Sequence, residues 1–129
     1  MAHPADRRYT KEHEWVKIDG STATVGITDY AQSSLGDIVY VELPKPGTKL
    51  ERTKAMGVVE SVKAVSDIYA PVSGTVREVN AAVEDDPAKV NADPLGAGWL
   101  VKLDLDGAAD ADGLLDAGAY EELVASLSR

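Results

Sequence analysis

Apolar and polar residues alternate over several short stretches of the chain, and this alternation predicts β-strands. The predicted strands are 14–19, 21–27, 37–43, 74–80 and 99–105. Asp19-Gly20 favours a hairpin turn between the first two, and we expect Trp99, which opens the last, to be buried like Trp15. Turn residues rather than long helices separate the strands, so the pattern indicates a mainly β domain without parallel βαβ units.

Helical signals are few. Thr28 can cap a short helix over 29–35, and Gly36 suits its end. A further short helical or loop stretch is expected to begin at Asp85. Asp116 is a plausible cap for a last helix, which we expect to dock on the sheets. The apolar face of that helix, with i, i+3, i+4 and i+7 spacing, consists of Tyr120, Leu123, Val124 and Leu127.

The stretch around Lys63 is the most informative part of the chain. Runs rich in β-branched residues lie on both sides of it, at 56–62 and 65–69. The segment between them is too short for a crossover connection, so the runs should pair as an antiparallel hairpin. Lys63 would then lie at or near the tip. An exposed lysine is usually only a solubility charge, but this one has small or apolar neighbours on both sides, which favours a lysine presented on a rigid turn.

Several segments resemble the glycine cleavage system H protein family. They are 9–16, 25–32, 35–44, 60–74 and 96–100. The likeness extends over about residues 9–127. It implies the barrel-sandwich hybrid fold of lipoyl and biotinyl carriers, with short helices and a C-terminal helix. We therefore expect a flexible N-terminal tail over 1–8 and a single lipoyl-carrier domain over 9–129.

The resemblance implies that lipoate is covalently attached to Lys63. Biotinyl carriers resemble Met-Lys-Met at this point, and the lipoyl domains of 2-oxoacid dehydrogenases resemble Asp-Lys-Ala. This chain has Val62-Lys63-Ala64 preceded by Glu60-Ser61, which is similar to the H protein form. Lipoate is therefore the expected cofactor, and biotin is the distant alternative.

The family likeness also implies a function. The lipoyl group would take an aminomethyl group from a pyridoxal-phosphate glycine decarboxylase and pass it to a tetrahydrofolate-dependent aminomethyltransferase. Dihydrolipoamide dehydrogenase would then reoxidise the dithiol, and a lipoate ligase or lipoyltransferase would attach the cofactor. No nucleophile–base–orienter set is evident in the sequence, in keeping with a non-catalytic carrier.

Two other functions use the same lysine. A lipoate relay, which donates lipoyl groups to other enzymes, would look the same in sequence. A Schiff-base enzyme would need Lys63 to have a depressed pKa, whereas Glu60 and Asp67 nearby would act in the opposite direction.

Two carboxylates are candidates for a cleft that holds the aminomethyl cargo. The amine of that cargo is cationic near neutral pH, and a carboxylate is its natural partner. Glu14 and Asp67 lie in segments that match the family; Glu12 does not, and we rank it lower. The simpler interpretation of Asp67 is an exposed strand charge.

Composition limits the remaining possibilities. The chain has 129 residues and a net charge of −9, which argues against nucleic-acid binding. It has no cysteine, and His3 and His13 alone do not suggest a metal site. No apolar run has membrane-spanning length, and the N-terminus lacks a signal-peptide pattern. The expected location is cytoplasmic, with a mature organellar protein as the open alternative.

Overall fold

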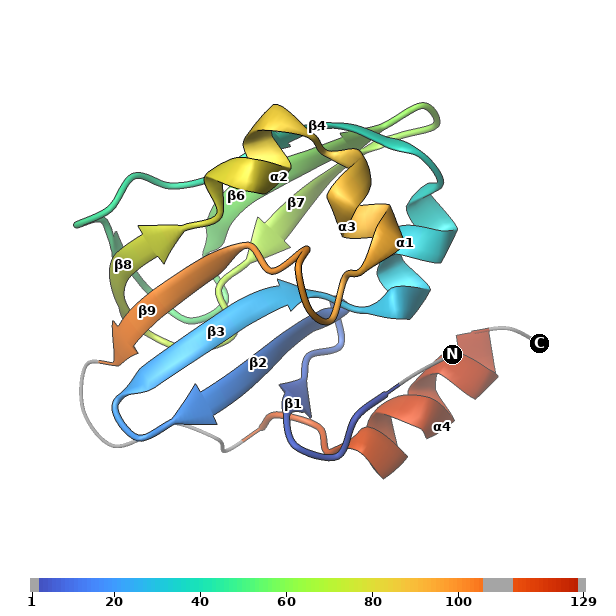
Figure 1. Ribbon diagram of the computed structural model, residues 1–129. Helices are drawn as coiled ribbons and strands as arrows, with labels where there is room; N and C mark the ends of the chain where they lie inside the picture. The colour runs from blue at the N-terminus through green and yellow to red at the C-terminus, as the bar shows by residue number, and fades with distance from the viewer. Residues whose placement is uncertain (1–2, 106–112, 128–129) are drawn as a thin grey trace.

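The structure is a computed structural model that describes residues 3–105 and 113–127, and it consists mainly of two antiparallel β-sheets (Figure 1). The larger sheet has the strand order β1-β2-β3-β9-β8-β5, and the smaller has the order β4-β6-β7. The strands are β1 (Arg8–Tyr9), β2 (Glu14–Asp19), β3 (Thr22–Ile27), β4 (Ile38–Glu42), β5 (Lys49–Leu50), β6 (Ala55–Ser61), β7 (Val65–Tyr69), β8 (Gly74–Val79) and β9 (Val101–Leu105). The predicted mainly β, barrel-sandwich architecture is confirmed.

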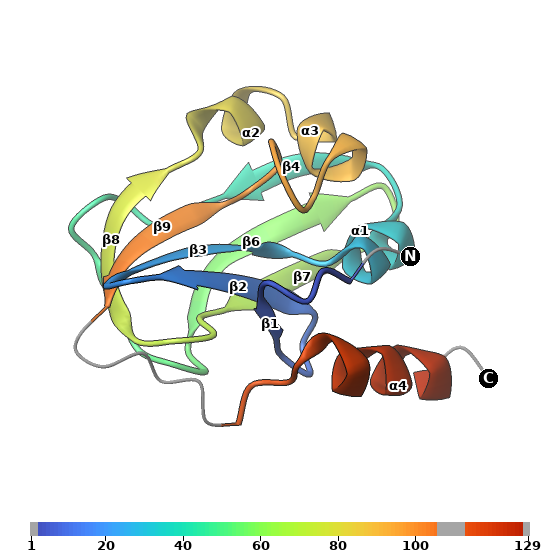
Figure 2. The same cartoon turned by 60° about the horizontal axis from the view of Figure 1, so that its bottom comes forward.

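Four helices accompany the sheets in the described part of the chain. They are α1 (Asp29–Leu35), α2 (Ala81–Asp85), α3 (Ala88–Ala92) and α4 (Ala117–Leu127). Helices α1 to α3 gather at the end of the sandwich toward which the β6–β7 turn points, whereas α4 lies apart from them beside β1 (Figures 1 and 2).

The core lies between the two sheets and is built from aliphatic side chains and Met56, because the sequence has no phenylalanine. Fully buried members of this core include Val16, Val25, Val72, Leu100 and Leu103. A second, aromatic cluster of Tyr9, Trp15 and Tyr120 lies under α4. The C-terminal helix therefore docks on β1 and β2 through its own small core.

The predicted ends of α1 are confirmed. Thr28 Oγ1 accepts a hydrogen bond from the Ala31 amide at 3.1 Å, as an N-cap does. Gly36 ends the helix with φ 78°, a left-handed conformation that costs glycine little. Strand β4 begins at Ile38, so the Gly36 cap sets the direction in which the chain leaves α1 for β4.

The stretch around Asp85 differs from the prediction. Asp85 ends α2 instead of beginning a helix, and α3 follows after Pro87. The start signal is Asn80, whose Oδ1 accepts from the Ala82 amide at 3.2 Å. Asn80 also donates to the carbonyl oxygens of Ala97 and Trp99, each at 2.8 Å. We predicted Asn80 as the last residue of a strand. In the structure it caps α2 and binds the loop that precedes β9.

Trp15 is buried as predicted, but Trp99 is not. The strand β9 begins at Val101, and Trp99 lies in a turn where its amide donates to the Gly96 carbonyl at 3.0 Å. Its partly exposed ring lies 4.8 Å from the ammonium of Lys102. The glycine-rich loop that precedes the strand extends further than the alternation indicated, and this places Trp99 at the edge of the aromatic cluster.

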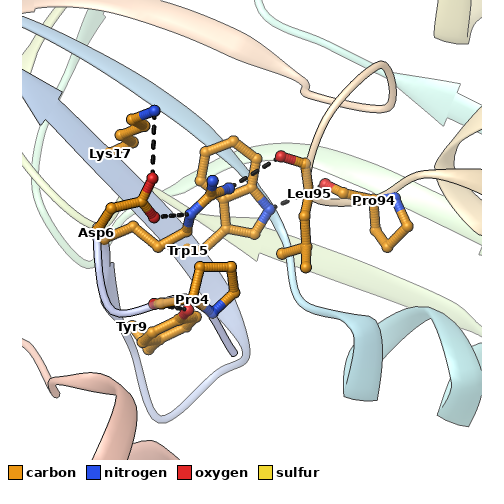
Figure 3. A network of polar contacts seen from close by, with 8 residues as sticks. Pro4, Asp6, Tyr9, Trp15, Lys17, Pro94 and Leu95 are labelled. Atoms are coloured by element: carbon orange, nitrogen blue, oxygen red, sulfur yellow. Dashed lines mark hydrogen bonds and ion pairs between the residues drawn. The ribbon is translucent and has the colours of Figure 1, made fainter. Parts of the chain in front are cut away.

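The described part of segment 1–8, for which we expected a flexible tail, makes side-chain contacts with the domain (Figure 3). The Arg7 guanidinium lies 4.6 Å from the Trp15 ring and donates to the Leu95 carbonyl at 2.9 Å. Its hydrogen bond to Asp6 lowers the pKa of that carboxyl, which also pairs with Lys17 at 3.3 Å. Residues 3–8 thus lie along the face that carries Trp15.

Replacement of the two tryptophans should separate a core residue from a surface one. We expect Trp15→Ala to lower the free energy of unfolding by about 3–5 kcal/mol, the usual range for a buried aromatic. Trp99→Ala should cost roughly 1–2 kcal/mol, because its side chain is only partly buried, at the edge of the aromatic cluster. Urea denaturation of both variants measures these losses. Equal losses would contradict the assignment of Trp15 to the core and Trp99 to its edge.

Candidate functional site

The β6–β7 hairpin presents Lys63 at its tip, as predicted. The last paired residues are Glu60 and Val65, and the Ser61 amide donates to the Ala64 carbonyl at 2.8 Å to close the turn. Ser61 Oγ accepts from the amides of Lys63 and Ala64, each at 3.1 Å. A serine side chain thus stabilises the turn in place of the Asn-Gly pair common in tight hairpins.

A second segment of the chain also restrains the turn that carries Lys63. The Val62 amide donates to the Asp37 carbonyl at 3.0 Å, which joins the turn to the α1–β4 junction. Asn91 of α3 fixes that junction in turn, because its side chain accepts from the Ile38 amide and donates to the Gly36 carbonyl, both at 2.9 Å. Lys63 therefore has a restrained backbone and an exposed side chain.

The side chain of Lys63 passes close to Gly36, which has no side chain to block it. A Cβ at position 36 would lie 3.0 Å from Lys63 Cε, tighter than ordinary van der Waals contact. The methylenes of Lys63 thus pass directly over this glycine. A larger residue at position 36 would push the lysine stem aside, in addition to the cost of its left-handed backbone.

A cavity of about 400 Å³ lies where the start of β2 meets the end of β7. It is lined by Thr10, Lys11, Glu12, Glu14, Arg52, Thr53, Tyr69, Ala70, Pro71, Gly113 and Leu114. The second strand of the hairpin leads from the turn that carries Lys63 to this cavity. The hairpin therefore connects Lys63 with the wall of the cavity that contains Tyr69.

Glu14 is the buried acid of this cavity, with 2% of its surface exposed. Its Oε1 accepts from the Thr10 hydroxyl and its Oε2 from the Tyr69 amide at 3.3 Å. Burial raises the pKa of Glu14 to about 7, and these two hydrogen bonds only partly oppose that effect. The side chain is therefore poised between its neutral and charged forms near pH 7.

Asp67 lies elsewhere. It is exposed on β7 and lines a separate hollow with residues of β4 and β6, among them Glu42 and Val58. The two predicted carboxylates thus line different cavities. Glu12, which we ranked lower, shares the cavity of Glu14.

Sequence reasoning missed several residues of the cavity. Arg52 and Thr53 come from the connection before β6, and nothing in their local pattern pointed to Glu14. Thr53 has φ 73°, which is unusual for a β-branched residue. Such a conformation persists only when the surroundings impose it; here the Thr53 amide donates to the Ala70 carbonyl at 2.8 Å.

Two negative findings concern residues 3–105 and 113–127. No group of three or more His, Cys, Asp or Glu side chains there is arranged to hold a metal ion. Within the same residues, no helix has the length and hydropathy needed to cross a membrane.

Comparison with known proteins agrees with this geometry. The family model described as glycine cleavage H-protein matches residues 7–127. The chain belongs to the glycine cleavage H-protein family. A glycine cleavage system H protein of Acidobacterium capsulatum is 62% identical, with 96% of this chain and 95% of the relative covered. One from Thermus thermophilus is 56% identical, with 98% of each covered.

A solved structure extends the likeness to three dimensions. The crystal structure of a glycine cleavage system H protein from Mycobacterium marinum superposes with a TM-score of 0.84 and 41% identity. The alignment covers 98% of this chain and 99% of the other. The shared fold therefore includes both sheets of this family member.

Glu14 should make the stability of the protein depend on pH in a defined direction. The folded state raises its pKa, so it binds more protons than the unfolded chain between about pH 4.5 and 7. The stability that Glu14 contributes is full below that window and declines as pH rises through it. Glu14→Gln cannot titrate and should lack this decline, which is on the order of 2–3 kcal/mol.

The measurement is urea unfolding of both proteins from pH 4.5 to 8. Burial lowers the pKa of His13, which acts in the opposite direction in both proteins. The difference between wild type and Glu14→Gln therefore isolates the effect of Glu14. Parallel pH profiles would show that Glu14 titrates as it does in the unfolded chain.

Proposed function

We propose that the protein is the lipoyl carrier of the glycine cleavage system, with lipoate in amide linkage to Lys63 Nζ. The observation that carries this proposal is the exposed side chain of Lys63 on a turn restrained by Ser61 and Asp37. A rigid base confines motion to the attached arm. When bound, lipoate supplies a disulfide that accepts an aminomethyl group and a dithiol that is later reoxidised.

The residues present fit such a group. Exposure of Lys63 leaves its amine accessible to an attaching enzyme, and the apolar side chains of Val62 and Val65 beside it are also exposed. The cavity that contains Glu14 offers a cationic amine a buried carboxyl partner. We assign to this chain the binding, orientation and shielding of the cargo, and we assign the chemistry to its partners.

These partners are the other components of the glycine cleavage system. We propose that glycine decarboxylase loads the carrier, that the aminomethyltransferase unloads it, and that dihydrolipoamide dehydrogenase reoxidises it. A lipoate ligase or lipoyltransferase attaches the cofactor. In this account the chain is a non-catalytic carrier, a single domain over 9–129, and it acts in the cytoplasm.

Glu14 is the favoured partner for the cargo amine. An ionised carboxylate has about four acceptor positions, and the Thr10 hydroxyl and the Tyr69 amide occupy two of them. A positive charge that enters the cavity would favour the ionised form of Glu14. An uncharged disulfide would not favour the ionised form of Glu14. We therefore expect the loaded arm to lie in the cavity more often than the oxidised arm.

The alternatives use the same exposed lysine. A Schiff-base enzyme needs a lysine that is desolvated or placed beside another cation, whereas Lys63 is exposed on a hairpin turn. A biotinyl carrier or a lipoate relay would also present the lysine at a turn. The modification found on Lys63 decides between lipoate and biotin, and transfer of the group to a second acceptor protein would indicate a relay.

Attachment at Lys63 is tested by intact mass after expression with lipoate and a lipoate ligase. We expect one lipoyl adduct on wild type and on Lys54→Arg, a control at an exposed lysine outside the turn. Lys63→Arg keeps the charge and should carry no adduct. An adduct on Lys63→Arg, mapped to another lysine, would disprove the assignment.

The role of the two carboxylates is tested by release of the cargo as formaldehyde and ammonia. Glu14→Gln keeps the shape but removes the charge, and the lost charged hydrogen bond is worth about 1.5 kcal/mol or more. Release should therefore be roughly tenfold faster. Asp67→Asn should have a smaller effect because Asp67 lines a different, exposed hollow. Unchanged release from the double variant would rule out both carboxylates.

A further inference from the structure

The hydroxyl of Tyr120 joins three parts of the chain that are far apart in sequence. Tyr120 is fully buried on α4, and its Oη lies 2.8 Å from His13 Nδ1 and 2.7 Å from Thr28 Oγ1. Thr28 is the N-cap of α1, and His13 directly precedes Glu14. One phenol therefore connects the C-terminal helix, the first helix and the turn that precedes Glu14.

One arrangement of protons satisfies every member of this network. Burial lowers the pKa of His13 and raises that of Tyr120 to about 12, so both are neutral near pH 7. Tyr120 can then donate to His13 Nδ1, while Thr28 donates to Tyr120. Thr28 Oγ1 still accepts from the Ala31 amide. Tyr120 Oη, His13 Nδ1 and Thr28 Oγ1 then each have a hydrogen-bond partner, as the low dielectric of a buried site favours.

The turn that Tyr120 contacts has an unusual backbone. His13 has φ 72°, in the left-handed region that few non-glycine residues adopt. The turn is closed by hydrogen bonds from His13 N to the Thr10 carbonyl at 3.1 Å and from Thr10 N to the Glu14 carbonyl at 2.9 Å. The side chain of Thr10 in turn donates to Glu14 Oε1. A change at His13 would therefore be transmitted to the carboxyl of Glu14 through Thr10.

The segment that leads into α4 also forms part of the cavity wall. Gly113 and Leu114 line the cavity, and the next residue, Leu115, exchanges two backbone hydrogen bonds with Tyr9 at 2.7 and 2.8 Å. The Tyr9 ring stacks on Tyr120 with centroids 4.8 Å apart. Docking of α4 thus fixes both the turn beside Glu14 and one wall of the cavity.

We propose that Tyr120 is a positioning residue for the cargo cavity: its hydroxyl holds the 10–14 turn so that the Glu14 carboxyl stays buried and aimed into the cavity. The part of this inference that concerns cargo rests on the proposed function. The part that concerns Glu14 does not, because it applies to the chain without lipoate.

The test compares two phenol deletions in the unlipoylated protein. Tyr120→Phe keeps the ring and its stacking but removes the hydroxyl. Tyr9→Phe is the matched control, because Tyr9 is equally buried and its hydroxyl donates to the Pro4 carbonyl, away from the turn. The readout is the titration midpoint of the Glu14 side-chain carboxyl, followed by 13C NMR.

We expect the Glu14 midpoint to fall by about 0.5 pH unit or more in Tyr120→Phe, because a loosened turn admits water to the carboxyl. Tyr9→Phe should leave it at the wild-type value. The charged neighbours in the cavity, Lys11, Glu12 and Arg52, are the same in every variant. An unchanged midpoint in folded Tyr120→Phe, or equal shifts in both variants, would overturn the proposal.

A second pair of variants covers the case in which Tyr120→Phe does not fold. His13→Asn places a polar side-chain atom near the position of Nδ1, and asparagine tolerates a positive φ. His13→Leu removes the polar atom. The Glu14 midpoint should stay near wild type in His13→Asn and fall in His13→Leu. Equal midpoints in these two proteins would also overturn the proposal.

The loaded protein gives a separate functional readout. Mass spectrometry should show full lipoylation of Lys63 in both tyrosine variants, with faster release of the aminomethyl cargo from Tyr120→Phe than from Tyr9→Phe. Equal release rates would count against the role of Tyr120 in retaining cargo. If Lys63 accepts no lipoate in any protein, the proposed function fails, whereas the Glu14 titration still decides the positioning role.

Discussion

The pairing of β6 with β7 couples the two halves of the proposed site. One end of the hairpin carries Lys63 on a turn fixed by Ser61 and by the Asp37 carbonyl. At the other end, the Tyr69 amide donates to the buried Glu14 carboxyl. Since one ladder of backbone hydrogen bonds sets both ends, an arm attached at the tip and a cavity at the base keep a constant relation. Everything proposed about loading and shielding depends on this relation.

The buried carboxyl gives the carrier its sensitivity to the state of the arm. Burial disfavours a charged Glu14, so a positive amine has an effect there that it would not have on an exposed acid such as Asp67. Thr53, whose backbone is unusual, lines this same cavity, and His13, which has a similar φ, directly precedes Glu14. Strained residues next to a functional group are a recurring feature of binding sites, and here the rest of the fold imposes the strain.

Local patterns predicted much of this structure. The β6–β7 hairpin, the cap at Thr28 and the position of Lys63 follow from residues close together in sequence. The cavity does not, because only the tertiary fold brings Arg52 and Leu114 into the same cavity wall as Glu14. Trp99 shows the same limit: alternation predicted a buried strand residue, whereas the loop before β9 holds it at the edge of the core.

The most direct test of the account follows the Glu14 carboxyl by 13C NMR in two states of lipoylated protein, with the arm oxidised and with the aminomethyl group loaded. A cationic amine at Glu14 stabilises the charged carboxylate by about 1.5–3 kcal/mol. The account therefore predicts that loading lowers the titration midpoint by roughly one to two pH units. A midpoint that is the same in both states would contradict it, because the cargo amine would then not lie beside Glu14.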